Sequence, residues 1–74
     1  MTVESIIEEI KNGKCMTIAC SQYEEATIYK RGMFKVFVED GLYEGPPIIR
    51  SEAQIRRDIE IALNNPDIYD IDVE

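Results

Sequence analysis

The stretch EATIYKRGMFKVFVE, residues 25–39, decides the fold of this chain. Apolar and polar side chains alternate on both sides of Gly32, which is the pattern of two strands that each bury one face. Arg31 and Gly32 interrupt the alternation at its midpoint, and glycine readily adopts the positive φ that a tight turn needs. The sequence therefore predicts an antiparallel hairpin with strands over residues 25–31 and 33–39. Its apolar face holds Ala26, Ile28, Phe34, Val36 and Val38.

A third strand is predicted before this hairpin, over residues 14–20, where Met16, Ile18 and Cys20 share one face. With a turn over residues 21–24, the three strands form an antiparallel meander. A small sheet with aromatic side chains on its second face is usually covered by a helix or used for contact. That second face is expected to carry Thr17, Thr27, Tyr29, Lys35 and Phe37.

Two amphipathic helices flank the meander. The first covers residues 3–12, with Thr2 as its N-cap and Gly13 in the left-handed position after its last turn. The second follows Ser51, which forms a capping box with Gln54, and it ends at residues 64–66. This order predicts one α+β domain over residues 1–74, a three-stranded antiparallel sheet flanked by two helices (α-β-β-β-α). The apolar stripes of the helices are Val3, Ile6, Ile7 and Ile10 in the first, and Ile55, Ile59, Ala62 and Leu63 in the second.

Two acidic segments lie outside these elements. Residues 40–50 (DGLYEGPPIIR) contain two glycines and two consecutive prolines, which predicts a long irregular connection, either a stiff crossover or a contact loop. Residues 67–74 (DIYDIDVE) form a short edge strand or an acidic tail, and the apolar Tyr69 and Ile71 favour the ordered alternative. If that segment is extended, the carboxylates at positions 70, 72 and 74 lie on one face, about 6.6 Å apart.

Composition excludes several kinds of function. The chain has no His, the commonest general base and metal ligand. Residues 67–74 lack the glycine and the closing glutamate of a calcium loop, so we expect no metal. The adjacent acids Glu8-Glu9 and Glu24-Glu25 point apart and cannot form an acid/base pair, so we expect no enzyme activity and no cofactor. A pI near 4.5 disfavours nucleic acid or an anionic membrane as a ligand. Double-stranded RNA-binding domains share the element order, but their phosphate-binding lysines are missing at the start of the second helix. Cys15 and Cys20 lie too far apart on one strand to bridge, and we expect them to be buried and reduced in a cytoplasmic protein.

The net charge of −7 is unevenly distributed. Residues 1–29 hold five acids and two bases, and residues 30–57 hold four acids and six bases. Residues 58–74 hold six acids and no base. The sequence therefore predicts a polarised surface, which serves either solubility or recognition of a basic partner.

The opening TVESIIEEIKNG (residues 2–13), followed by a three-stranded meander and a second helix in a very small acidic chain, resembles the small phage anti-CRISPR proteins. The similarity covers the first helix and the order of elements through about residue 63. The resemblance implies an inhibitor that acts in the host cytoplasm. Such an inhibitor mimics DNA and occupies the site where an RNA-guided nuclease reads its target duplex.

The sequence thus predicts a non-enzymatic protein that binds a nucleic-acid-handling protein partner through acidic contacts and aromatic anchors. An alternative is a regulatory or assembly module that forms a homodimer through Tyr29 and Phe37 on the aromatic face of its sheet. The predicted partner-binding residues are Glu39, Asp40, Tyr43, Glu44, Asp67, Tyr69, Asp70 and Asp72.

Overall fold

The computed structural model describes residues 1–19, 24–40, 43–44, 46–66, 68 and 70–74. Within these ranges, two helices and six strands follow one another, and all the strand pairs are antiparallel. The α+β class is confirmed. In chain order the elements are α1 (Val3–Lys11), β1 (Met16–Ala19), β2 (Glu24–Arg31), β3 (Met33–Asp40), β4 (Tyr43–Glu44), β5 (Ile48–Arg50), α2 (Glu52–Asn64) and β6 (Asp70–Val73).

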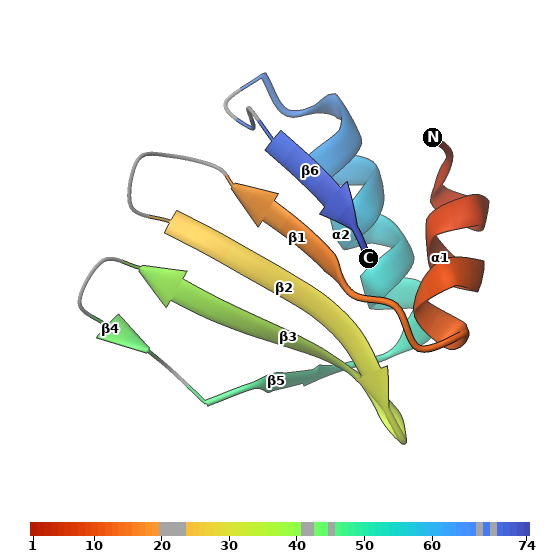
Figure 1. Cartoon of the computed structure of the whole chain (residues 1–74), viewed down its shortest axis with the longest axis horizontal. Helices are drawn as coiled ribbons and strands as arrows, with labels where there is room; N and C mark the ends of the chain where they lie inside the picture. Colours follow the sequence, from red (N-terminus) through yellow and green to blue (C-terminus); the bar gives the residue numbers. More distant parts are fainter. Residues whose placement is uncertain (20–23, 41–42, 45, 67, 69) are drawn as a thin grey trace.

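The β2–β3 hairpin forms the centre of the sheet, as the alternation predicts. Its strands pair symmetrically about Gly32, whose φ of 74° is the positive value that favours glycine at this turn. The sheet order is β4-β3-β2-β1-β6, and β5 pairs with β3 beside the hairpin. The last strand therefore lies next to the first one and forms an edge of the sheet (Figure 1).

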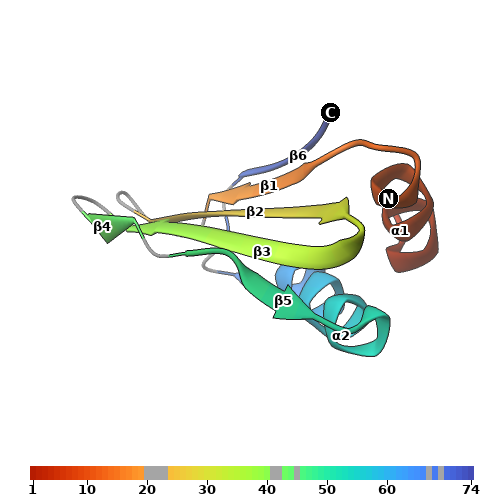
Figure 2. The same cartoon turned by 90° about the horizontal axis from the view of Figure 1, so that it is seen from below.

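Both helices lie on the same side of the sheet, and the other side carries no element in the part of the chain that the structure describes (Figure 2). The helices bury the predicted stripes, with Ile7, Ile10, Ile55 and Ile59 wholly inaccessible to solvent. Apolar burial of this kind is the main stabilising term in so small a domain. From the sheet, the core receives Met16, Ile18, Ile28 and Phe34.

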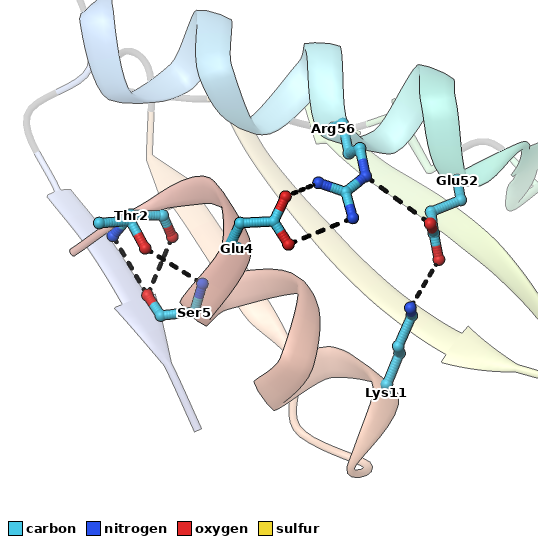
Figure 3. A network of polar contacts seen from close by, with 6 residues as sticks. All are labelled: Thr2, Glu4, Ser5, Lys11, Glu52 and Arg56. Carbon is cyan, nitrogen blue, oxygen red and sulfur yellow. Dashed lines mark hydrogen bonds and ion pairs between the residues drawn. The ribbon is translucent and has the colours of Figure 1, made fainter.

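Polar contacts join the two helices on their outer surface (Figure 3). The Arg56 guanidinium is paired with the Glu4 carboxylate of α1 and also lies 3.6 Å from Glu52 within its own helix. The Lys11 ammonium at the end of α1 lies 2.8 Å from Glu52. Side-chain hydrogen bonds from these bases lower the pKa of Glu4 and of Glu52. Because Arg56 and Lys11 each pair with an acid of the other helix, the network helps to hold α1 beside α2.

The helix caps are confirmed. The Ser51 hydroxyl accepts from the backbone N–H of Gln54 at 3.2 Å, and the Gln54 side chain accepts from the backbone N–H of Ser51 at 2.8 Å. Thr2 makes the same reciprocal pair with Ser5 at the start of α1 (Figure 3). These side chains satisfy N–H groups that have no partner within the helix.

The structure corrects the sequence analysis in two places. The connection over residues 40–50 contains the short strands β4 and β5 and is therefore not irregular throughout. Together with β6, which the sequence analysis leaves open as an edge strand or a tail, they extend the three-stranded meander to six strands among the described residues. Proline has no backbone N–H to donate to a strand ladder, so Pro47 itself predicts an interruption. The β-branched residues after it can donate, and they pair with β3, where Ile48 lies opposite Val36. Cys15 is a free, half-buried thiol, less buried than predicted, and Cys20 lies outside the described residues.

Candidate functional site

The segment DIYDIDVE contributes an edge strand, as its alternation favours. In β6 the side chains of Ile71 and Val73 are half-buried against the core, whereas Asp70 and Asp72 are exposed. Glu74 continues the ladder through two backbone hydrogen bonds with Cys15, of 2.7 and 2.9 Å. We call Asp70, Asp72 and Glu74 the β6 carboxylates. Residues two positions apart on an extended strand are separated by about 6.6 Å, so these carboxylates follow one another along one side of the sheet.

A second line of acids crosses the strands. Glu39 in β3 lies directly opposite Glu25 in β2, Glu25 lies opposite Ala19 in β1, and Ala19 lies opposite Asp70 in β6. We call Glu25, Glu39 and Asp70 the acidic row, and all three are exposed. Adjacent strands are about 4.8 Å apart, so Glu25 and Glu39 are close neighbours of like charge. The row meets the β6 carboxylates at Asp70, so the two lines of charge share a corner.

No ion pair neutralises these acids within the residues that the structure describes. All eight bases are among those residues, and the four that form ion pairs bind acids on or beside the helices. Those bases are Lys11, Lys14, Arg50 and Arg56. The acids of the acidic row and the β6 carboxylates therefore form no ion pair with a described base.

The structure brings together only part of the predicted partner-binding set. Glu39, Asp70 and Asp72 lie on the open face of one sheet, although Asp70 is more than thirty positions from Glu39 in the sequence. The backbone of Asp40 ends β3 and pairs with Tyr43, and Glu44 pairs with Glu39 in register. Asp67 and Tyr69 lie outside the described residues.

Glu25 is the residue that the sequence analysis missed. A hairpin centred on Gly32 pairs residues that are equally distant from it, so Glu25 and Glu39 are mirror positions. That symmetry was already visible in the sequence and could have identified Glu25. The position of Asp70 in the same line could not have been found in this way, because it depends on β6 pairing with β1.

The other end of the open face is apolar and basic. Tyr29 and Phe37 are half-buried there, and Met33 and Ile49 are 56% and 57% exposed. Lys35 is paired with Tyr29 on one side and with Ile49 on the other. The open face therefore changes along β3 from apolar and basic, near the hairpin turn, to acidic at Glu39.

Among the described residues, no three acids or cysteines converge as metal ligands would. Neither α1 nor α2 is long and apolar enough to cross a membrane, and no other helix occurs in the described ranges. Comparisons with protein-family models, with curated proteins and with solved structures find no match to this chain.

Proposed function

We propose that this protein binds and blocks the basic, nucleic-acid-binding surface of a protein partner, acting as a DNA mimic. Of the partners that fit this description, an RNA-guided nuclease inhibited by a phage anti-CRISPR protein is the one to which the sequence resemblance points. The observation that carries the proposal is the acidic row, in which Glu25 and Glu39 face each other across two strands with no base paired to either.

Like charges directly opposite on a sheet destabilise it by about 0.2–1 kcal/mol. On the helices, by contrast, four acids are paired with bases, namely Glu4, Glu9, Glu52 and Asp58. Two like charges that face each other with no base beside them lower the stability of the fold. Such a locally destabilising arrangement is typical of a functional surface. The counter-charge that the acidic row lacks is then supplied by the partner.

The spacing of the row supports competition with DNA. One DNA strand carries a charge every 3.4 Å of helix axis. Glu25 and Glu39 lie on neighbouring strands, about 4.8 Å apart, and Asp70 follows two strands beyond Glu25, at about 9.6 Å. A channel lined by Arg and Lys attracts such a surface over long distances and raises the association rate at low salt. Protein occupying that channel then excludes the duplex.

Displacement of DNA tests this proposal. A labelled duplex bound to a purified RNA-guided nuclease is titrated with the protein, and fluorescence anisotropy reports release. We expect release, with an apparent affinity that falls steeply between low and high salt. The double variant Glu25→Lys/Glu39→Lys should weaken release at least tenfold.

The matched control is Glu8→Lys/Glu60→Lys, which changes the net charge equally at exposed positions on the helices. We expect this control to remain within about threefold of the unmodified protein, because those positions lie away from the open face. Equal losses in the two double variants would show that net charge alone acts, and would overturn the assignment of the acidic row.

A second candidate function is a module that dimerises through the apolar end of the open face. The exposure of Met33 and Ile49 next to Tyr29 and Phe37 favours it, since exposed apolar patches mark interaction sites. Sedimentation at micromolar concentration separates the two functions. A dimer that Phe37→Asp converts to a monomer supports the module, and a monomer that displaces DNA supports the inhibitor.

A further inference from the structure

The outer edge of β6 has unused backbone hydrogen-bonding groups. Glu74 exchanges two hydrogen bonds with Cys15 of the neighbouring strand, and in an antiparallel ladder such pairs alternate with pairs that make none. Asp70 and Asp72 therefore direct their N–H and C=O groups toward β1, and Ile71 and Val73 direct theirs away from the sheet. No described strand pairs with that outer side, which forms the free upper edge of the sheet in Figure 1.

The two sides of this edge differ in chemistry. On the open face the β6 carboxylates are exposed and form no ion pair with any described residue. On the helix side, Ile71 and Val73 pack partly against the core and remain accessible. A strand added here would place its side chains alternately beside acids and beside apolar groups.

Two hollows lie on the helix side, one at each end of β6. The first, of about 260 Å³, separates the end of α2 from the start of the strand. The second, of about 330 Å³, separates α1 from the end of the strand. Ala62, Leu63, Asn65, Ile68, Asp70 and Ile71 line the first hollow. Met1, Ser5, Ile6, Glu9, Lys14 and Val73 line the second. Ile71 lines the first hollow and Val73 the second, so alternate side chains on the helix side of an added strand would lie next to one hollow each.

We propose that β6 accepts an extended segment of the protein partner as an additional antiparallel strand, and that this segment alternates basic with apolar residues. Its basic side chains lie beside the β6 carboxylates, and its apolar side chains enter the two hollows. Its backbone hydrogen-bonds to Ile71 and Val73. This is strand addition to a sheet edge, in which the backbone supplies affinity and the alternating side chains supply specificity. The inference deepens the proposed function, because it specifies which part of a basic partner the acidic corner at Asp70 receives.

The probe is a synthetic octapeptide that alternates lysine with valine, capped at both ends and titrated into the isotope-labelled full chain by NMR. We expect shift changes at Ile71, Val73, Leu63 and Ile6, and slower hydrogen exchange at the amides of Ile71 and Val73. A peptide of the same composition in the order Lys-Lys-Val-Val should bind at least tenfold more weakly, because its side chains cannot divide between the two faces.

Two N-methylated forms of the alternating peptide test the backbone contact. In antiparallel pairing the valine residues, opposite Ile71 and Val73, exchange hydrogen bonds with β6, and the lysine N–H groups point to solvent. Methylation of the valine amides should therefore reduce affinity at least tenfold, and methylation of the lysine amides should change it less than threefold. Equal effects of both methylations, or equal binding of the reordered peptide, would overturn the proposal.

A charge variant separates this inference from the proposed function. Asp72→Lys should weaken peptide binding several-fold, and Glu60→Lys, with the same change in charge on α2, should not. If the peptide fails to bind while the protein still displaces DNA, the strand-addition site is wrong and the DNA mimic stands. If the peptide binds as described and no DNA is displaced, the DNA mimic is wrong and the strand-addition site stands.

Discussion

The acids on the two sides of the sheet differ in whether they lie beside a base. On the helix side, each of the acids Glu4, Glu9 and Glu52 lies beside a base, and Arg56 joins α1 to α2 through two of them. On the open side, Glu25 and Glu39 face each other without a base. The ion pairs on the helix side therefore join elements within the chain, whereas Glu25 and Glu39 on the open side carry charges that no described base neutralises.

The largest effect on stability is expected from a substitution on the buried side of α2, compared with one on the exposed side of the same helix. Ile59 of α2 is completely buried, and Ile61 in the same helix is 56% exposed. Ile59→Ala should lower the free energy of unfolding by about 2–5 kcal/mol, because it leaves a cavity in a small core. Ile61→Ala should change it by less than about 0.5 kcal/mol. Urea denaturation checks both values, and similar losses would mean that α2 is oriented differently.

A smaller effect is expected at the ion pair that ties β5 to α2. Arg50 donates two hydrogen bonds to the carboxylate of Asp58, at 2.9 and 3.1 Å, in a part-buried position. Lysine cannot reproduce this two-pronged geometry, so Arg50→Lys should cost about 0.5–1 kcal/mol. Arg57→Lys is the matched control, since Arg57 is exposed and forms no ion pair with a described residue. Thermal unfolding should show a lower midpoint for the first variant only.

Removing a charge from the acidic row should raise the stability of the fold, whereas the two preceding substitutions lower it. Glu25→Gln and Glu39→Gln each remove a like-charge contact, so each should stabilise the fold by about 0.2–1 kcal/mol. Because either change alone removes the repulsion, the double variant should be less stable than the sum of the two gains predicts. A double-mutant cycle by urea denaturation measures this coupling. Additive gains would show that the two carboxylates do not interact and would weaken the case for the row.

The smallest effect on stability is expected from lowering the pH. The pKa of Glu4 and that of Glu52 lie below their ordinary value of 4.5, chiefly because Arg56 and Lys11 respectively hydrogen-bond to the ionised forms. The stabilisation is therefore complete above pH 4.5 and is lost as the pH falls through the lowered values of the folded protein. Thermal unfolding between pH 7 and pH 3 should show this loss, and the Glu4→Gln/Glu52→Gln variant should show a flatter profile. An unchanged profile in that variant would assign the acid sensitivity to other carboxylates.

The sequence predicts the local elements well because their causes are local. The capping box at Ser51, the positive φ at Gly32 and the apolar stripe of α1 each depend on residues a few positions apart. The strands β4 and β5 were missed because they are too short to show a periodicity. Ile48 and its neighbours become a strand only when β3 is beside them.

The candidate site also has a part that depends on neighbouring residues and a part that depends on distant strands. The β6 carboxylates were predicted from the alternation in residues 67–74, and Asp70 and Asp72 are found exposed on one face. The acidic row requires the register of four strands, and its corner at Asp70 requires β6 to lie beside β1. Alternation within a strand is encoded in adjacent residues, whereas pairing between distant strands is decided by the packing of the whole core.

The position of β6 at the end of the sheet has a consequence for folding. The β2–β3 hairpin closes a short loop at Gly32, but the pairing of β6 with β1 joins residues more than fifty positions apart. Closure of a long loop costs more chain entropy, and a four-residue edge strand has few contacts to offset that cost. We therefore expect the amides that β1 and β6 share to exchange with solvent through local openings before those of the hairpin. The strand to which a partner would bind is then also the part of the sheet that detaches most readily, and a bound segment would hold it in place.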